Sequence, residues 1–324
     1  MTRAEVRRFR RSRRADPAYS DLGGLLQALI AGVGVLVVAF LLVRATGASA
    51  LTVTLLALVV GAVAWGLVSA SSGLRWRRRA RLHAFGEANG LAYTPQSPAG
   101  GYPGAIFDVG SSRTTLDTLR RLSPRALDYG NLRYTTGSGK QRRTHHWGYL
   151  ALQLDRRLPH MVLDARANNG LFGATSLPTA FSRDQVLSLE GDFDRHFTLY
   201  CPREYERDAL YVFTPDLMAL LIDESSAYDV EIVENWMFVY STSPFELTAA
   251  ATHHRLLRIV DTVGAKTITQ TDRYADERIG DRTVDLVAPR GQRLRSGAWW
   301  AAPLAVLAIV GVLLWLLVSF LTSM

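Results

Sequence analysis

Residues 190–240 read EGDFDRHFTLYCPREYERDALYVFTPDLMALLIDESSAYDVEIVENWMFVY, and they hold the densest run of strand and helix signals outside the apolar segments of the chain. Apolar and polar residues alternate over residues 197–201, which is the two-residue period of a β-strand. Residues 214–216, Thr-Pro-Asp, are favoured at the N-cap and in the first turn of a helix. The stretch therefore predicts a strand followed by a helix that begins at Pro215.

Two more features of this stretch bear on the fold. Residues 210–213 are aromatic and branched, and they predict a second short strand. Residues 230–232 and 236–240 alternate as strands do, and residues 234–235, Glu-Asn, lie between them. Asn tolerates a positive φ, so a tight hairpin turn is predicted there. The order strand, strand, helix, hairpin predicts an α+β fold built on an antiparallel sheet with flanking helices.

The run FDRHFTLYCPREYERDALYVFTPDLMALL, with the hairpin predicted after it, resembles a bacterial membrane-anchored family of the high-GC, actinobacterial type whose function is unknown. In that family a Phe-rich strand leads to an acidic-aromatic segment, a Thr-Pro helix start and a closing hairpin. The resemblance covers residues 190–240 of the 324. It implies the fold and a membrane anchor, and it implies no catalytic residues.

Three apolar segments are long enough to cross the ~30 Å hydrocarbon core of a bilayer. They are residues 24–43, 51–70 and 298–320. The short link between the first two predicts a transmembrane helical hairpin. Small residues recur at every fourth position in both segments, a spacing that lets helices pack closely, either within the hairpin or in an oligomer.

The net charge of +8 is concentrated beside these segments. Seven Arg lie in residues 1–23, five in residues 75–81 and three in residues 290–295, whereas residues 84–289 carry a net negative charge. A domain that binds nucleic acid would need the basic charge on its own surface, so this class is disfavoured. The positive-inside rule predicts a bacterial cell-membrane protein with its N-terminus and soluble domain in the cytoplasm and its C-terminus outside.

These observations divide the chain into six parts. They are a basic disordered tail (1–23), the transmembrane hairpin (24–70), a basic juxtamembrane segment (71–83), a soluble α+β domain (84–265), a polar connector (266–297) and the C-terminal transmembrane helix (298–320). Trp76 is predicted at the membrane interface. Within the soluble domain, further strands are predicted at 105–109, 128–136 and 144–154, and a helix at 244–263.

Two sequence features that can indicate a ligand-binding or catalytic site do not indicate one here. The turn at residues 137–140 resembles a phosphate-binding loop, but that motif requires Gly and Ser or Thr where the chain has Tyr134 and Gln141. Cys201 is the single cysteine, which excludes an intrachain disulfide. Because it falls on the apolar side of a predicted strand, a buried and inert thiol is predicted.

Four polar residues are weak candidates for an acid–base or metal site: Asp155, His160, Asp164 and His196. No His/Cys ligand spacing or catalytic motif accompanies them, and clustered polar residues without a motif are usually structural. We therefore predict that His160 and His196 do not converge, and we predict no cofactor and no metal.

Three functions are compatible with this pattern. The preferred one is a membrane-anchored cytoplasmic interaction or scaffold module, with membrane lipids and a protein partner and with homo-oligomers as a further option. The second is a membrane-bound enzyme that uses the four candidate residues. The third is a sensor of anionic lipid that uses the arginines beside the membrane, each worth about 1 kcal/mol near an anionic leaflet.

Overall fold

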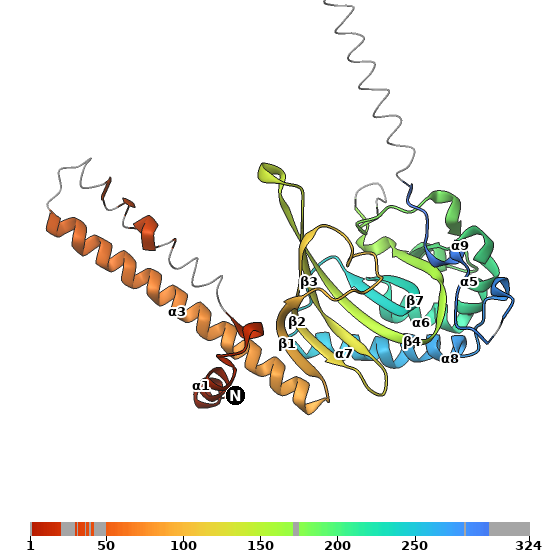
Figure 1. The fold of residues 1–324 in the computed structure, drawn as a ribbon, viewed down its shortest axis with the longest axis horizontal. Helices are drawn as coiled ribbons and strands as arrows, with labels where there is room; N and C mark the ends of the chain where they lie inside the picture. Colours follow the sequence, from red (N-terminus) through yellow and green to blue (C-terminus); the bar gives the residue numbers. More distant parts are fainter. Residues whose placement is uncertain are drawn as a thin grey trace, which may run out of the picture. The chain divides into compact units, whose positions relative to one another are not determined.

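Figure 1 shows a computed structural model of the chain, which describes residues 2–20, 30, 32–35, 37, 38, 40, 41, 50–170, 175–281 and 283–297. The chain divides into two compact units. The first unit comprises Met1–Ser97 with Asp117–Leu119, and the second comprises Pro98–Leu116 with Arg120–Met324.

The first unit begins with a helix where the sequence predicts a disordered tail. Helix α1 (Arg3–Arg13) is followed by a 3-10 turn, η1 (Pro17–Tyr19). The Thr2 hydroxyl accepts the N–H of Glu5 at 3.3 Å, and the Glu5 carboxylate accepts the N–H of Thr2 at 2.7 Å. This reciprocal capping box satisfies two free donors at the helix start, so α1 is stabilised locally despite its many like charges.

Helix α3 (Ala50–Ala88) is one uninterrupted helix that includes the second predicted span and the whole juxtamembrane segment. Large apolar side chains near its start are exposed, with 72% of Leu51 and 74% of Trp65 accessible. The helix over Leu58–Ala88 is long and apolar enough to cross a bilayer, by length and composition. Strand β1 (Ala92–Pro98) follows it.

The other predicted spans are largely outside the described residues. Of residues 24–43, those that the structure describes are helical. Residues 298–320 lie outside the described residues altogether. The transmembrane hairpin and the C-terminal span therefore stay predictions.

Trp76, which the sequence predicts at the membrane interface, lies in the core of the first unit. It is 5% exposed. Its ring stacks on Tyr19 with the centroids 6.1 Å apart and meets Phe9 edge-on at 6.2 Å. The guanidinium carbons of Arg79 and Arg10 lie 5.4 Å and 5.6 Å from the ring centroid. The side chains that cover this ring come from α1, η1 and α3 itself, and α1 and η1 lie where the sequence predicts a disordered tail.

The second unit is built on an antiparallel sheet, which confirms the predicted α+β class. Its strands are β2 (Ser111–Arg121, of which residues 117–119 belong to the first unit), β3 (Leu127–Thr136), β4 (Arg143–Ala165), β5 (Val186–Leu187), β6 (Phe197–Tyr200) and β7 (Asp229–Ser241). The order along the sheet is β2-β3-β4-β6-β5, and β7 pairs with β4. The pairs β3–β4, β4–β6, β4–β7 and β5–β6 are all antiparallel.

Strands β3 and β4 form the hairpin predicted around residues 137–140, with Thr136 opposite Arg143 and a 3-10 turn, η2 (Gly139–Gln141), at its tip. The strand predicted at residues 105–109 is wrong, because this segment forms a turn. Its apolar residues fill the core instead of pairing in the sheet: Ile106 is fully buried and Phe107 is 2% exposed.

The hairpin predicted at residues 234–235 is also wrong. Strand β7 runs straight through this point and pairs with β4 on both sides of it. Glu234 has a φ of +54°, and the register shifts between Gln153 and Leu158 of β4, where residues 154–157 have the single counterpart Asn235. A β-bulge therefore accommodates the polar residues that suggested a turn.

The helices of the second unit follow the sequence in part. Helix α6 (Pro215–Ser225) begins where predicted, with Pro215 in its first turn. The strand predicted at residues 210–213 is wrong, because residues 206–212 form helix α5 (Glu206–Val212). Ala209 and Val212 are fully buried while Leu210 is exposed, which is a helical period and not the period of a strand.

The helix predicted at 244–263 begins later and ends later. It consists of α7 (Ala250–Ile259), a π-helical turn η7 (Val260–Gly264) and α8 (Ala265–Thr271), so it includes the start of the predicted connector. Phe245 lies before this helix because its backbone is hydrogen-bonded to the Asn131 side chain. The Phe245 N–H donates to Asn131 Oδ1 at 2.6 Å, and Asn131 Nδ2 donates to the Phe245 carbonyl at 3.1 Å. The shorter helices are α4 (Phe193–His196) and α9 (Pro289–Gln292), and the 3-10 turns are η3 (Arg166–Asn168), η5 (Arg183–Gln185), η6 (Arg203–Tyr205) and η8 (Glu277–Ile279).

The two faces of the sheet carry two packed layers. Helices α7 and α8 run along one face, where Gly264 lets the helix approach Leu152 and Met237 closely (Figure 1). On the other face, Tyr149, Phe238 and their neighbours pack against the turn at residues 104–107. Because both faces are covered, Asp229 and Glu231 of β7 are buried.

Candidate functional site

A buried polar cluster joins β4, β7 and the C-terminal segment of the second unit. His160 on β4 and Glu231 on β7 are 5% and 1% exposed. Glu231 Oε1 lies 2.7 Å from His160 Nε2, and Oε2 accepts hydrogen bonds from the Tyr240 hydroxyl at 2.6 Å and the Ala105 N–H at 2.7 Å. Burial first, and the Glu231 carboxylate second, raise the pKa of Tyr240 well above its usual range, so its hydroxyl stays a donor.

The hydrogen bonds assign the tautomer of His160. Its Nδ1 lies 2.9 Å from the backbone N of Leu294. A backbone N–H can only donate, so Nδ1 carries no proton and Nε2 carries the proton that is donated to Glu231. The Nδ1 lone pair is therefore occupied, and the ring has no free position for a metal ion.

The β-bulge explains how these residues come to one face. Before the bulge, Tyr149 of β4 lies opposite Tyr240 of β7, and beyond it Val162 lies opposite Glu231. Both strands change the phase of their alternation by one residue between these pairs, across the register shifts that flank Leu158 and the positive φ of Glu234. Glu231 therefore reaches the same face as Tyr240.

Two buried carboxylates, Asp164 and Asp229, lie on the same face beyond His160. Asp229 accepts hydrogen bonds from the Ala165 N–H at 2.8 Å and the Ser176 hydroxyl at 2.9 Å. Asp164 accepts the Thr175 hydroxyl at 2.8 Å. Burial, with the charge of Asp164 as a smaller cause, raises the pKa of Asp229 to about 6. Burial likewise raises the pKa of Asp164.

The C-terminal segment of the described chain is fastened to the sheet domain at successive residues. Leu294 donates its N–H to His160 and is itself buried. The Gln185 side chain forms two hydrogen bonds with the Arg295 backbone: it donates to the carbonyl and accepts from the N–H, each at 2.8 Å. Ser296 forms an isolated bridge with Phe181. His160 thus acts as the point at which this segment docks on β4.

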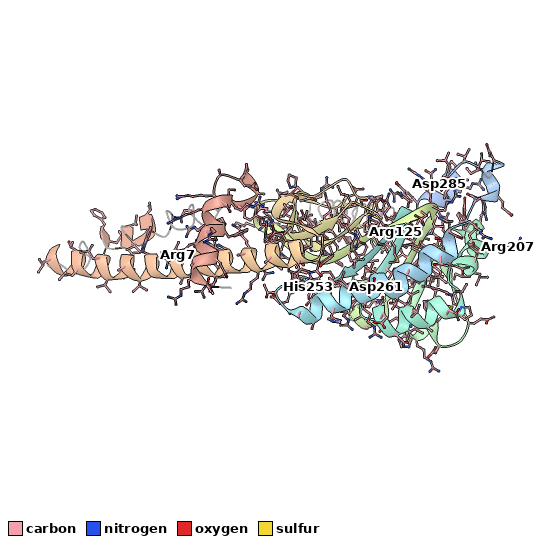
Figure 2. All side chains as sticks on the ribbon, turned by 90° about the horizontal axis from the view of Figure 1, so that it is seen from below. Arg7, Arg125, Arg207, His253, Asp261 and Asp285 are labelled. Carbon is pink, nitrogen blue, oxygen red and sulfur yellow. The ribbon has the colours of Figure 1, made fainter. Side chains whose placement is uncertain are left out.

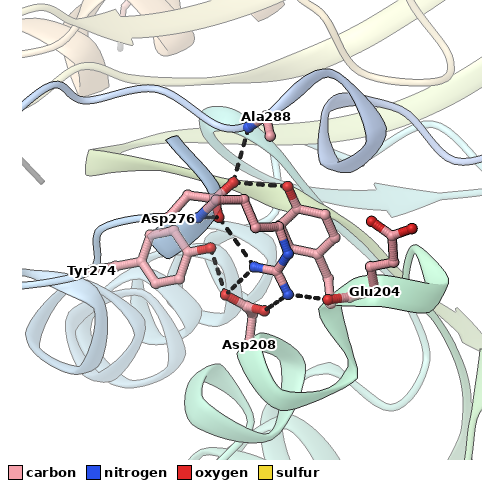
Figure 3. Close-up of polar contacts among 7 residues, drawn as sticks. Glu204, Asp208, Tyr274, Asp276 and Ala288 are labelled. Atoms are coloured by element: carbon pink, nitrogen blue, oxygen red, sulfur yellow. Dashed lines mark hydrogen bonds and ion pairs between the residues drawn. The ribbon is translucent and has the colours of Figure 1, made fainter. Parts of the chain in front are cut away.

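A second polar cluster surrounds Arg278 in the second unit (Figure 3). The guanidinium lies 3.0 Å from Asp208 and 3.1 Å from Asp276, and stacks 3.8 Å from the centroid of the Tyr205 ring. Burial would raise the pKa of Asp276, but hydrogen bonds, chiefly from the backbone N–H of Ala288 and of Arg278, outweigh it and lower the pKa. The Tyr205 hydroxyl and the Ala288 N–H both donate to Asp276, at 2.7 Å and 2.9 Å, so the cluster ties η6, η8 and the start of α9 together.

The four residues suggested by the sequence serve different local purposes. Asp155 forms an exposed ion pair with Arg125, with oxygens 2.7 Å and 3.0 Å from its two nitrogens. His160 bonds Glu231, and Asp164 lies near Asp229. His196 ends α4 and is half-buried. Within the described residues, no group of three His, Cys, Asp or Glu side chains is placed to hold a metal ion.

The sequence did not point to Glu231, Asp229 or Tyr240. The alternation of residues 229–232 placed the acidic side chains on the solvent side of a strand, because a one-residue change of phase is invisible in the pattern. A signal was nonetheless present, since the stretch DVEIVENWMFVY is too apolar on both faces for a half-exposed strand. Cys201 matches its prediction: it is 1% exposed, and burial raises the pKa of its thiol to about 12.

Comparison with known proteins gives little further information. No family model matches the chain, and no curated protein matches it. Among solved structures, the chain is similar to the crystal structure of the mycobacterial trehalose monomycolate transport factor A, TtfA. The sequence identity is 10% and the TM-score is 0.37, over 56% of this chain and 92% of that one. A similarity of this size establishes no function for this chain.

Proposed function

We propose that the protein is a membrane-anchored module that presents its second unit to a protein partner at the cytoplasmic face of a bacterial membrane. The observation that carries this proposal is helix α3. Its first part leaves large apolar side chains exposed, while the same helix continues without a break into a segment where Trp76 and Leu82 are buried. Exposed apolar surface of this extent is unfavourable in water and suits lipid.

The polar side chains support binding as the function of the second unit. His160 and Glu231 are buried and fully engaged with each other and with backbone groups. Catalysis would require such groups to reach a substrate, whereas here they fasten β4, β7 and the C-terminal segment together.

The second unit also has large apolar side chains on its surface, and these are the positions at which we place the partner. They come from several elements and loops: Leu122, Val186, Leu210 and Leu286 are 75%, 45%, 53% and 46% exposed. Exposed apolar side chains are frequent sites of contact between proteins when they gather in patches.

Crosslinking in intact membranes tests this proposal. A photoreactive phenylalanine derivative is placed singly at Leu122, Val186, Leu210 or Leu286 of the full chain, and at the exposed polar positions Lys140 and Asp223 as controls. We expect an adduct of one defined mass that contains a second protein at one or more apolar positions and at neither control. Equal adducts at all positions, or none at any, would contradict the proposal.

The Asp164–Asp229 pair is the observation that favours an enzyme as the second candidate. A carboxyl group with a pKa of about 6 can exchange protons near neutral pH. Asp229 is fully buried, however, so a substrate would need an opening of the chain to reach it. The test is an assay of the purified chain for hydrolytic or transfer activity. An activity that is abolished in Asp229→Asn and kept in Asp155→Asn would favour the enzyme over the interaction module.

A further inference from the structure

Four arginines surround a hollow of about 450 Å³ on the second unit. They are Arg203, Arg290, Arg293 and Arg295, and Glu204 and Gln185 complete much of the lining. We propose that this hollow binds the phosphate group of an anionic lipid headgroup. Guanidinium groups suit this ligand because their planar donor fork matches phosphate oxygens.

The arginines come from three segments whose backbones are held in place. Arg203 begins η6 and Arg290 lies on α9. Residue 291 of α9 is a glycine, and any side chain there would collide with the Tyr205 ring at the end of η6. The two segments are therefore packed closely, and the positions at which the side chains of Arg203 and Arg290 emerge are fixed by this packing.

The third segment carries two of the arginines on alternate residues. Leu294 is 9% exposed and belongs to the hydrophobic core, whereas Arg293 and Arg295 on either side of it line the hollow. The hydrogen bond from Leu294 to His160 and the two bonds between Gln185 and the Arg295 backbone hold this alternation. The buried cluster at His160 thus positions the arginines without touching the ligand.

The ion pairs already present in the hollow are weak competitors for a phosphate. Arg290 pairs with Glu204, and both Arg203 and Arg295 pair with Asp184. The side chains of Arg203, Arg290 and Arg295 are 65–80% exposed, and exposed ion pairs contribute about 0–1 kcal/mol. Arg293 also pairs with Glu234, at 3.2 Å. Four arginines therefore face three carboxylates, and the hollow keeps a net positive charge that an anion can neutralise.

The place of the hollow in the chain selects a lipid as the source of the phosphate. Arg295 lies three residues before residue 298, where the last predicted span begins, so at most about 10 Å of chain separates them. If the span crosses the membrane as proposed, the hollow lies at the depth of the lipid headgroups. A volume of about 450 Å³ is within the range of small-ligand sites. This inference rests on the proposed membrane anchor.

Lipid binding to the full chain in detergent, followed by native mass spectrometry, tests the inference. The probes are short-chain phosphatidylglycerol, short-chain phosphatidylcholine and inorganic phosphate. We expect phosphatidylglycerol to bind at least tenfold more tightly than either other probe, and its binding to weaken as salt is raised. Inorganic phosphate that binds as tightly as phosphatidylglycerol would overturn the lipid assignment, and equal binding of the two lipids would overturn the anionic one.

Matched variants locate the binding. The hollow variant carries Arg→Gln at residues 203, 290 and 295, and the control carries Arg→Gln at residues 142, 143 and 207, which are exposed and do not line the hollow. Arg207 lies on the outer side of the unit in Figure 2. We expect at least a tenfold loss of phosphatidylglycerol affinity in the first variant and less than a twofold change in the second. Equal losses would overturn the assignment.

A single substitution shows whether a loss of affinity in the triple variant comes from misfolding. Arg290 is 80% exposed, so Arg290→Glu leaves the fold intact and should still reduce phosphatidylglycerol affinity at least threefold. An unchanged affinity would overturn the inference. The photocrosslinks at the apolar positions do not depend on this hollow, so loss of lipid binding and loss of the protein partner are separate outcomes.

Discussion

Replacing His160 by alanine should cost about 3–5 kcal/mol of the free energy of unfolding. The substitution removes a side chain that is 5% exposed and leaves the Glu231 carboxylate buried with one oxygen unpaired. Leaving a buried carboxylate without its donor costs about 1–3 kcal/mol, and more when the carboxylate is ionised. The substitution also leaves the N–H of Leu294 without an acceptor, which adds about 1–3 kcal/mol where no water enters.

Two isosteric substitutions separate the two bonds of the ring. His160→Asn keeps an oxygen near the position of Nδ1 and so retains the bond from Leu294, whereas His160→Gln keeps a donor near the position of Nε2 and retains the bond to Glu231. We expect both to be intermediate in stability. His254→Ala is the control, because His254 is exposed on α7.

Chemical denaturation of the full chain in detergent measures the stability, and amide hydrogen exchange measures the docking of the C-terminal segment. The amide of Leu294 should exchange faster in His160→Gln and His160→Ala than in His160→Asn. A loss below about 1 kcal/mol in His160→Ala, together with unchanged exchange at Leu294, would refute the role of His160 as the docking point.

Three further predictions follow from single residues. The pKa of Asp229 is about 6, above its usual value near 4, so between these values the folded state keeps a proton that the unfolded chain has lost. The contribution of Asp229 to the free energy of unfolding should therefore fall by about 3 kcal/mol as the pH rises from roughly 4 to 6. Asp229→Asn should remove this fall from denaturation curves measured across that range. Gly148→Ala should cost about 1–3 kcal/mol in the same assay, because a Cβ there would lie 2.8 Å from the Phe245 ring; a neutral effect would mean that this ring can move aside. Cys201, buried and with its thiol pKa raised to about 12, should resist alkylation in the folded chain and react once denatured, and rapid labelling of the native chain would show that β6 opens.

The elements that the sequence predicted correctly are those with local signals. The hairpin of β3 and β4 has a glycine-rich turn between alternating runs, and α6 has Pro215 at its start. Residues 206–212 also carried a local signal, since Glu206 and Asp208 suit the first turn of α5, but the aromatic residues after them favoured a strand. Burial of Ala209 and Val212 against the rest of the unit decided the outcome.

The candidate site depended on a feature that no local pattern reveals. The bulge opposite Asn235 changes which side chains of β4 and β7 share a face, and this brings Glu231 to His160 and Tyr240. The sequence identified His160 and predicted a structural use, which its two hydrogen bonds support. It could not identify the partners, because they are 71 and 134 residues away along the chain.

Cysteine labelling in right-side-out membrane vesicles tests the proposed membrane topology. Cys201 is buried and is the single cysteine, so added cysteines can be labelled selectively by a membrane-impermeant maleimide. Ser138→Cys lies on the exposed tip of the β3–β4 hairpin, and Ser323→Cys lies after the last predicted span. We expect labelling at position 323 in sealed vesicles and labelling at position 138 only after the vesicles are opened. Labelling of both positions in sealed vesicles, or protection of both, would contradict this topology.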